Sequence, residues 1–331
     1  MLDGYSAPDL FRAAAAPHAR RLYLVTGGCG FIGSHLVEAL LAYGDAVRVL
    51  DDLSRGRREN LPRGVEFIEA DVADPVALRR VIQDVDGCFH LAAMPSVIEC
   101  QSRWLEAHRT NLTGTINVFD AARRAQPGNP IPVVYASSAA VYGNRGVAPL
   151  GEALAPQPIS ICGADKVGCE LHARIAHAAH GVPTVGLRLF NVFGPRQSAD
   201  CPYPGVVPSF LARLGAGRPV SIFGDGAQVR DFVFVGDAVT ALLAAMGRCA
   251  GAEVFNVCSG SGTTMVVLAR LIARLVAVEA EIAFLPARAS DVRYSVGDPT
   301  CAARVLGFTA ATAIEVGIEA TVRALRTVNA I

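Results

Sequence analysis

Three glycines spaced three residues apart constrain the fold of this chain more than any other feature. Gly27, Gly30 and Gly33 come directly after residues 22–26, an apolar run typical of a buried parallel strand, and they open a helical stretch over 31–42. Glycines in this position allow a tight turn, a close approach of the backbone to a pyrophosphate, and tight packing of helix on strand. The helix N-terminus then offers unpaired N–H groups to the phosphates. A glycine trio alone is weak evidence, but the strand before it and the helix after it predict a dinucleotide site.

The end of the second predicted strand refines this expectation. Asp51 follows the apolar run 46–50 and lies 18 residues beyond Gly33, where an acid is expected to bind a ribose hydroxyl. A carboxylate there repels a 2′-phosphate, so the sequence favours NAD over NADP. Three basic residues weaken that preference somewhat: Arg55, Arg57 and Arg58. A structural turn with a solvated acid is the alternative interpretation.

The chain up to about residue 190 alternates strands with helices. Strands are predicted over 22–26, 46–50, 65–69, 87–91, 132–136 and 184–189. Helices are predicted over 31–42, 75–82, 99–125 and 163–180. This alternation predicts an α/β fold with a doubly wound parallel sheet of the Rossmann type.

The pattern changes after Asn191, where Pro and Gly become frequent and the alternation weakens. We therefore expect a smaller C-terminal α+β domain. The predicted parts are an N-terminal extension over 1–21, a Rossmann domain over 22–190 to which 232–257 returns, and a second domain made of 191–231 and 258–331.

The composition argues against several classes of protein. The 331 residues include 30 basic and 30 acidic ones, so the formal net charge is zero and a nucleic-acid partner is not expected. Apolar residues make up 52% of the chain, enough for a large core. The longest apolar stretch, 266–285, contains four charged residues and does not suit a membrane span. Nine scattered cysteines without a CxxC pair indicate reduced thiols in the cytoplasm, and no metal site is expected.

Several motifs together resemble one family, the extended short-chain dehydrogenases/reductases of the NAD-dependent nucleotide-sugar epimerase/dehydratase type. The similarity is strongest to the UDP-hexose 4-epimerases and runs from about residue 22 to the C-terminus. The matching segments are Thr26-Gly-Gly-Cys-Gly-Phe-Ile-Gly-Ser-His35, His90-Leu-Ala-Ala93, Asn111-Leu-Thr-Gly-Thr115, Tyr135-Ala-Ser-Ser-Ala-Ala-Val-Tyr-Gly143, Arg188-Leu-Phe-Asn-Val-Phe-Gly-Pro-Arg196, Gly224-Asp-Gly226, Arg230-Asp231 and Asp291-Val-Arg-Tyr-Ser295.

The resemblance implies a set of binding residues. NAD would be bound by Gly27, Gly30, Phe31, Ile32, Asp51, Asp71, Val72, Leu91, Ala92, Ala93, Asn111 and Lys166. The nucleotide-sugar substrate would be bound, in the second domain and at its border, by Ser138, Asn191, Arg230, Arg288, Asp291 and Ser295. Arginine suits a diphosphate because it pairs with two oxygens and stays charged.

The resemblance also implies a reaction. A base removes a proton from the sugar hydroxyl while hydride leaves C4 for NAD, and hydride then returns to the opposite face of the 4-keto sugar. The base is normally a tyrosine followed four residues later by a lysine, with a Ser or Thr nearby. Here Ser138 and Lys166 match, but Cys162 stands at the tyrosine position. A thiol is the stronger acid, with a pKa of about 8.5 against about 10, yet its sulfur reaches much less far than a phenol oxygen.

This substitution leaves three interpretations open. The protein binds NAD and a nucleotide sugar but is nearly inactive; a water, the Cys162 thiolate or another hydroxyl such as that of Tyr142 replaces the base; or a different reaction of the fold has been adopted. Dehydration and decarboxylation are disfavoured because Ala139 and Ala140 stand where those relatives carry acidic residues. The small Ser295 leaves room for a 2-acetamido group or a similarly large substituent, so a UDP-hexose, a UDP-N-acetylhexosamine and a UDP-uronate are all possible substrates.

Taken together, the sequence predicts a cytoplasmic NAD-dependent UDP-sugar 4-epimerase with weakened or altered acid–base chemistry at Ser138, Cys162 and Lys166. The alternative is a catalytically silent NAD- and nucleotide-sugar-binding protein that acts as a sensor or a partner subunit. The family also leads us to expect a homodimer that forms through the helices near 99–125 and 163–180.

Overall fold

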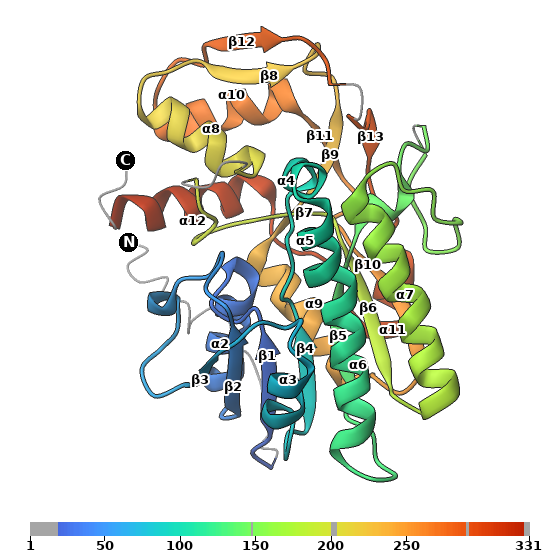
Figure 1. Ribbon diagram of the computed structural model, residues 1–331. Helices are drawn as coiled ribbons and strands as arrows, with labels where there is room; N and C mark the ends of the chain where they lie inside the picture. Colours follow the sequence, from blue (N-terminus) through green and yellow to red (C-terminus); the bar gives the residue numbers. More distant parts are fainter. Residues whose placement is uncertain (1–18, 147, 200–203, 289–290, 328–331) are drawn as a thin grey trace.

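The computed structural model describes residues 19–146, 148–199, 204–288 and 291–327, so most of the expected extension over 1–21 lies outside the described residues. A seven-stranded sheet forms the larger part of the molecule (Figure 1), and all of its strands run parallel. Its strands are β1 (Leu22–Thr26), β2 (Ala46–Asp51), β3 (Glu66–Glu69), β4 (Gly87–His90), β5 (Val133–Ser138), β6 (Thr184–Leu189) and β10 (Ala252–Val257). The predicted doubly wound Rossmann-type sheet is confirmed.

The strand order, β10-β6-β5-β4-β1-β2-β3, reverses direction between β1 and β4. From β1 the chain proceeds to β2 and β3 on one side, and it then crosses to β4, β5 and β6 on the other. A crevice opens outside the carboxyl ends of the strands at such a switch point, and ligands of open α/β sheets bind there. The fold thus places the glycine turn, which follows β1, beside the segment that follows β4.

Helices cover both faces of the sheet, and each face has its own apolar core. Along β1, Tyr23 and Val25 point to one face and Leu24 to the other, as the two-residue period of a strand requires. One face is covered by α2 (Phe31–Ala42), α9 (Val235–Gly247) and α11 (Thr300–Leu306). The other face is covered by α3 (Pro75–Val81), α6 (Gly114–Ala125) and α7 (Ile161–His180). Because both faces of the sheet are buried, the central strands β1 and β4 are rich in buried residues, whereas the edge strand β3 exposes a glutamate at each end.

The long helix predicted over 99–125 is divided in the structure. It consists of α4 (Val97–Ser102), α5 (Trp104–His108), a π-helical turn over Arg109–Thr113, and α6. Arg103 has dihedral angles of −128° and 53°, which are not helical, and this residue separates α4 from α5. The break turns α4 toward the crevice above the sheet (Figure 1).

A smaller lobe is built from later segments and has its own core. Its strands and helices are β7 (Asn191–Phe193), α8 (Val206–Gly215), β8 (Val220–Phe223), β9 (Val229–Phe234), β11 (Gly262–Thr264), α10 (Met265–Val276), β12 (Ile282–Leu285), β13 (Tyr294–Ser295) and α12 (Ile314–Thr327). Two short 3-10 helices complete the fold, over Arg58–Asn60 and Ala139–Tyr142. In Figure 1 the smaller lobe lies above the sheet.

The proposed division into domains stays a prediction, and the structure adds two facts to it. β10, which lies within 232–257, is the edge strand of the large sheet next to β6. Ala302, Leu306 and Phe308 pack into the core of that sheet, although we expected all of 258–331 in the second domain. The reason is the apolar face of α11, which lies against β10. In the described part of the chain, no helix combines the length and the apolar character needed to cross a membrane.

Candidate active site

The turn after β1 has the backbone that a dinucleotide site needs. Gly27 adopts a φ of +70°, and a Cβ there would lie 2.6 Å from the amide nitrogen of Ala92. A Cβ on Gly33 would lie 2.2 Å from the carbonyl oxygen of Gly27. No side chain caps the N-terminus of α2, so the first N–H groups after Gly30 face the crevice. The glycine turn and the uncapped N-terminus of α2 therefore offer backbone N–H groups that fit a pyrophosphate.

Asp51 is held beside this glycine turn by the backbone. Its Oδ2 accepts a hydrogen bond from the Cys29 amide at 2.9 Å, and its Oδ1 accepts one from the Leu53 amide at 2.9 Å. Burial raises the pKa of Asp51, and the two hydrogen bonds oppose that rise. Each oxygen keeps a lone pair that can accept a ribose hydroxyl. The carboxylate therefore stands where the sequence analysis expected it, in the wall of the crevice.

One large cleft lies between the sheet and the smaller lobe. It has a volume of about 2060 Å³, well above the roughly 300–1,000 Å³ of a pocket for one small ligand, and it can accommodate two. Ten of the twelve residues expected to bind NAD line it, namely Gly27, Gly30, Phe31, Ile32, Asp51, Val72, Leu91, Ala92, Ala93 and Lys166. All six residues expected to bind the substrate line it too, namely Ser138, Asn191, Arg230, Arg288, Asp291 and Ser295.

Asp71 and Asn111 are the two expected residues that do not line the cleft. Asp71 forms an ion pair with Arg109, Oδ2 to Nη1 at 2.5 Å. Asn111 is fully buried, accepts a hydrogen bond from the Met94 amide at 2.8 Å and donates one to the Met94 carbonyl at 3.2 Å. Asn111 therefore shapes the segment after β4 from behind, and a direct contact of either residue with NAD stays a prediction.

Ser138, Cys162 and Lys166 all line this cleft. Ser138 ends β5, and its Oγ accepts a hydrogen bond from the Ala140 amide at 3.1 Å, which leaves its own hydrogen for a ligand. Cys162 and Lys166 lie in the first turns of α7, four residues apart and therefore on one face of the helix. Ser160 caps that helix by accepting a hydrogen bond from the Gly163 amide at 3.1 Å.

Lys166 is the single lysine of a chain that otherwise uses only arginine as its strong base. The residue is only 5% exposed. Among the described residues, its ammonium group has no hydrogen-bond or ion-pair partner, and it lines the cleft. A buried cation that is left without a protein partner is available to a ligand and to the thiol of Cys162.

Cys162 is a strongly perturbed thiol. It packs against Met94, Cys100 and Ala107 and is 4% exposed. The neighbouring Cys100 thiol, and then the ammonium of Lys166, lower the pKa of Cys162 to about 7, although burial and Asp165 raise it. The thiol therefore ionises more readily than an ordinary thiol, which suits a general base.

Two other candidate bases are engaged elsewhere. Tyr142 is fully buried, donates a hydrogen bond to Asn256 Oδ1 at 2.7 Å and accepts one from Arg188 at 2.9 Å, and burial raises its pKa to about 12. It does not line the cleft. His90 bridges the hydroxyls of Thr26 and Thr115 at 2.7 and 2.9 Å, and burial lowers its pKa to about 3. The Tyr142 hydroxyl is thus engaged inside the fold and its raised pKa disfavours it as the base.

A buried ion pair that the sequence analysis did not assign fixes the relative positions of β5, β6 and α7. Arg188 donates to both carboxylate oxygens of Glu170, at 2.9 and 2.8 Å, and Ser137 donates to the same carboxylate at 2.6 Å. Burial alone would lower the pKa of Arg188, but Glu170 and Tyr142 raise it above its usual value. Glu170 lies four residues beyond Lys166, so the pair holds the face of α7 that carries Cys162 and Lys166 against Ser137, the neighbour of Ser138. The sequence did contain a signal for Glu170: residues 162, 166 and 170 are spaced four apart and therefore lie on one face of α7.

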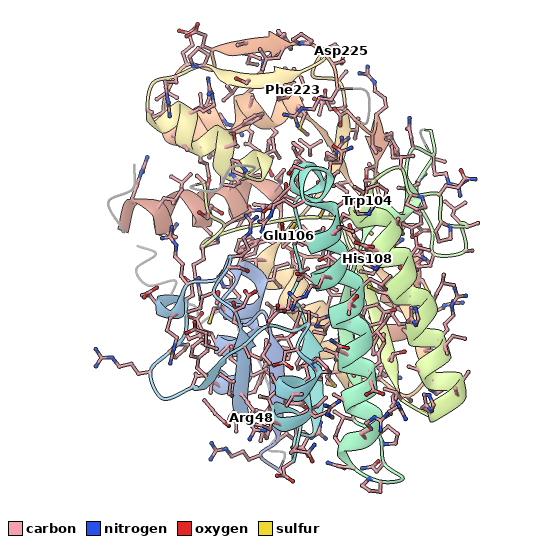
Figure 2. The ribbon with its side chains drawn as sticks, in the orientation of Figure 1. Arg48, Trp104, Glu106, His108, Phe223 and Asp225 are labelled. Carbon is pink, nitrogen blue, oxygen red and sulfur yellow. The ribbon has the colours of Figure 1, made fainter. Side chains whose placement is uncertain are left out.

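We expect Glu170→Ala to lower the free energy of unfolding by about 3–5 kcal/mol, because it leaves the Arg188 guanidinium buried and unpaired. The matched control is Glu66→Ala, which removes the partner of Arg48 at the surface, 2.8 Å away, and should cost at most about 1 kcal/mol. Figure 2 labels Arg48 at the rim of the molecule. Urea unfolding of both variants tests this difference, and equal losses would show that the Glu170–Arg188 pair stabilises no more than a surface pair.

The smaller lobe presents its polar groups from the opposite side of the cleft. Arg230 pairs with Asp291, Nη2 to Oδ1 at 2.6 Å, and the Arg288 guanidinium lies 3.5 Å from the centre of the Phe223 ring. Figure 2 labels Phe223 in this lobe. The Asn191 amide donates to the Asp231 carbonyl at 2.9 Å. Two arginines and a nearby aspartate leave a net positive charge there, which suits a diphosphate.

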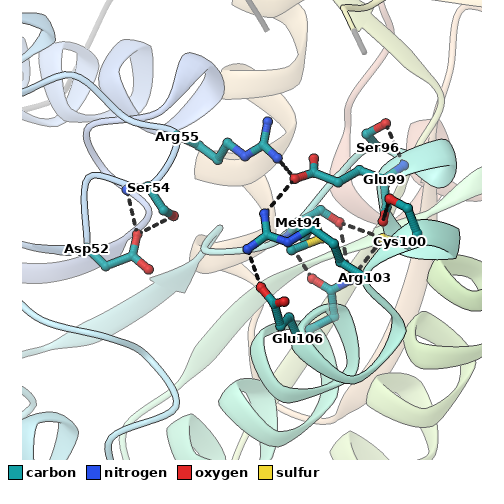
Figure 3. A network of polar contacts seen from close by, with 11 residues as sticks. Asp52, Ser54, Arg55, Met94, Ser96, Glu99, Cys100, Arg103 and Glu106 are labelled. Atoms are coloured by element: carbon teal, nitrogen blue, oxygen red, sulfur yellow. Dashed lines mark hydrogen bonds and ion pairs between the residues drawn. The ribbon is translucent and has the colours of Figure 1, made fainter. Parts of the chain in front are cut away.

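A salt-bridge network spans the cofactor side of the cleft (Figure 3). Arg55, from the loop after β2, forms an ion pair with Glu99 of α4, and Glu99 also pairs with Arg103 at 3.0 Å. Glu99 is only 4% exposed, and its second carboxylate oxygen has no partner among the described residues. Through the Arg55–Glu99 pair, the network connects the loop after β2, which also carries Asp52 and Ser54, to helix α4 after β4. Both segments border the cleft beside the glycine turn.

The chain is similar to known proteins in both sequence and fold. A family model described as the NAD dependent epimerase/dehydratase family matches residues 23–258. A UDP-glucose 4-epimerase of Mycolicibacterium smegmatis is 38% identical over 310 residues, which cover 92% of this chain and 98% of that protein. The crystal structure of UDP-glucose 4-epimerase from Thermotoga maritima with UDP-glucose is 36% identical, with a TM-score of 0.89 and coverage of 93% of this chain and 99% of that one. The Thermus thermophilus UDP-glucose 4-epimerase in complex with NAD is 33% identical, with a TM-score of 0.85 and coverage of 92% and 99%.

Proposed function

Because the chain belongs to the NAD-dependent epimerase/dehydratase family, we propose that it is a UDP-sugar 4-epimerase whose acid–base group is the thiol of Cys162. The observation that carries this proposal is the position of three side chains. Ser138, Cys162 and Lys166 line the same cleft as the glycine turn and the arginines of the smaller lobe. A nucleotide sugar bound by those arginines would extend toward Ser138, Cys162 and Lys166. A dinucleotide bound at the glycine turn would reach the same three residues from the opposite end of the cleft.

NAD, when bound, supplies the acceptor and later the donor of hydride at C4 of the sugar. The residues of the chain supply the rest. Lys166 binds the nicotinamide ribose and stabilises the thiolate of Cys162. That thiolate takes the proton of the C4 hydroxyl through one bridging water, because its sulfur lies only one bond beyond Cβ and a base must come within roughly 2.6–3.2 Å of its partner. Ser138 orients the same hydroxyl through its free hydrogen.

The opposite wall of the cleft selects the substrate. Arg230 and Arg288 would bind the diphosphate, with Asn191 and Asp291 beside them. Ser295 is a small residue in the same wall, and it leaves room for a substituent larger than a hydroxyl. We therefore propose UDP-hexoses, UDP-N-acetylhexosamines and UDP-uronates as the substrate class.

The short reach and the burial of Cys162 favour one second candidate, a protein that binds NAD and a nucleotide sugar without turnover. Incubation with UDP-glucose, UDP-N-acetylglucosamine and UDP-glucuronate, followed by NMR of the C4 proton, separates the two. Appearance of a C4 epimer above the background of a heat-inactivated sample supports the epimerase. Binding of NAD and UDP-sugar without any epimer supports the silent protein.

We also propose a homodimer that forms through α5 and α7. These helices pack on each other and expose the apolar side chains Trp104, Leu105, Leu171 and Ile175. Figure 2 labels Trp104 on this side of the molecule. Ile175→Glu is expected to give monomers in sedimentation velocity, while Val76→Glu, at an equally exposed position on α3, leaves the dimer intact. Dimers in both variants would place the interface elsewhere.

The cytoplasmic location expected from the sequence remains a proposal. The eight described cysteines are free thiols, as expected in a reducing compartment. Fractionation of cells that express the tagged protein tests it.

A further inference from the structure

We propose that Cys100 and Cys162 form a redox-active dithiol in the wall of the cleft, at which a peroxide oxidises Cys162 and Cys100 then closes a reversible disulfide. The two cysteines lie 62 residues apart in the chain, in α4 and in the first turn of α7. Their side chains pack in one small buried cluster with Met94 and Ala107, and each thiol shifts the pKa of the other. This pair is a modification site, and it goes beyond the proposed function.

The surroundings of the two sulfur atoms differ in a way that suits such a pair. Cys162 lines the cleft, so a small oxidant can reach it from solvent. Cys100 is fully buried behind it, and its sulfur lies 3.3 Å from the Met94 carbonyl (Figure 3). The single S–H hydrogen of Cys100 can point to that carbonyl or to the sulfur of Cys162. When Cys162 is ionised, the second arrangement stabilises the thiolate.

Charged groups assign the two roles. The Cys100 thiol from α4 and the Lys166 ammonium from α7 lower the pKa of Cys162, whereas burial and the Asp165 carboxylate from α7 raise it, and the net shift is downward, to about 7. The neighbouring Cys162 and burial raise the pKa of Cys100. Because Cys162 also lines the cleft while Cys100 is fully buried and does not, Cys162 is the nucleophile that reacts first, and Cys100 is the resolving thiol.

The other thiols with a clear shift are protected from this chemistry. Burial raises the pKa of Cys29, Cys88, Cys169, Cys249 and Cys258. A thiol that stays protonated at neutral pH is a poor nucleophile. Cys169 is the most useful of them, because it lies on α7 two turns after Cys162, is fully buried and does not line the cleft.

The chemistry balances with a peroxide as the only co-reactant. The Cys162 thiolate attacks one oxygen of hydrogen peroxide, an S–O bond forms, the O–O bond breaks, and the hydroxide that leaves takes a proton from solvent to become water. The sulfur of Cys100 then attacks the sulfenic acid of Cys162. An S–S bond forms, the S–O bond breaks, and the second hydroxide takes the proton of the Cys100 thiol. Two thiols lose two hydrogens, and one peroxide becomes two waters.

Closing the disulfide requires a movement of the backbone around Cys100. Helix α4, which has six residues and follows the irregular segment 91–96, would shift toward α7 until the sulfurs reach the bonding distance of about 2.05 Å. The disulfide would remove the thiolate from beside Lys166. If the proposed function is correct, this step stops turnover, and a dithiol reductant restores it.

The test treats the folded full-length protein with hydrogen peroxide at pH 7, blocks the remaining thiols by alkylation, and maps the peptides by mass spectrometry. We expect one cross-linked pair, the peptides of Cys100 and Cys162, with a mass lower by two hydrogen atoms and a return to two thiols after dithiothreitol. Cys100→Ser should instead give the sulfinic acid at Cys162, because the resolving thiol is missing. Cys169→Ser is the matched control and should form the Cys100–Cys162 link at the rate of the unmodified protein.

Alkylation provides a second measurement that needs neither the disulfide nor activity. Iodoacetamide should label Cys162 faster than the other described cysteines, half-maximally near pH 7, and a mixture of NAD and UDP should slow the labelling by covering the cleft. Three results overturn the dithiol: Cys100 and Cys162 stay alkylatable after peroxide, Cys162 goes to the sulfinic acid with Cys100 present, or it pairs with another cysteine. If the Cys100–Cys162 disulfide forms but the protein produces no C4 epimer, the proposed dithiol is supported and the proposed epimerase function is contradicted.

Discussion

Lys166→Met is expected to lower the rate of C4 epimerisation by about 10²–10⁴-fold at pH 7. The ammonium is buried, lacks a partner among the described residues, and lies one helical turn from Cys162. Its removal raises the pKa of Cys162 and takes away the proposed contact with the nicotinamide ribose. The measurement is the initial rate of epimer formation by NMR, with bound NAD quantified after denaturation so that loss of chemistry is separated from loss of cofactor.

The matched control for this substitution is Arg174→Met, which removes an exposed cation from the same helix and should leave the rate within about twofold, since exposed charges this far away are screened. Because Lys166 is the single lysine, reductive methylation of the chain modifies this side chain and the N-terminal amine alone. Bound NAD and UDP-sugar should protect Lys166 from it. A Lys166→Met protein that retains full activity would remove Lys166 from the mechanism.

Cys162→Tyr is expected to raise the epimerase rate by at least about tenfold, because a phenol oxygen extends several ångströms farther than a thiol and a well-placed acid–base group contributes about 10²–10⁴-fold. The position lines the cleft, and Lys166 would lower the pKa of the phenol from its usual value of about 10. The initial rates of both proteins with the same UDP-sugar, each saturated with NAD, measure the gain.

The control for the tyrosine variant is Cys162→Phe, which introduces the same ring without a hydroxyl. A gain with Tyr but not with Phe assigns the effect to proton transfer. Equal rates for the two variants would mean that the base lies elsewhere in the cleft, and the proposed role of this position would be wrong.

Much of the fold could be predicted, because strands and helices produce hydrophobic patterns among residues that are close in the sequence. The apolar run 22–26 and the helix 31–42 have the bounds found in the structure, and the doubly wound sheet follows from the alternation. The break between α4 and α5 within 99–125 could not be predicted, because it depends on the dihedral angles of one residue, Arg103. The packing of α11 on the sheet is also a tertiary effect, since its apolar face would suit either lobe.

Residues of the candidate site could be predicted where they stand at the end of a strand, because strand ends border the cleft. Strand ends located the glycine turn, Asp51 and Ser138. The prediction was weaker for Asn111, whose amide is bound to the backbone of Met94 rather than exposed to the cleft. The contact of Cys100 with Cys162 joins two helices that are distant in sequence, and no local spacing predicts it.

The most direct test of the central claim uses UDP-glucose with deuterium at C4. The account holds that the cleft binds NAD beside the sugar and that the hydride removed from C4 returns to the same carbon. We therefore predict that the purified protein carries or takes up NAD and forms the C4 epimer with the deuterium retained, without net accumulation of NADH. A protein that does not bind NAD, or an epimer that has exchanged its C4 deuterium for solvent hydrogen, would contradict the account.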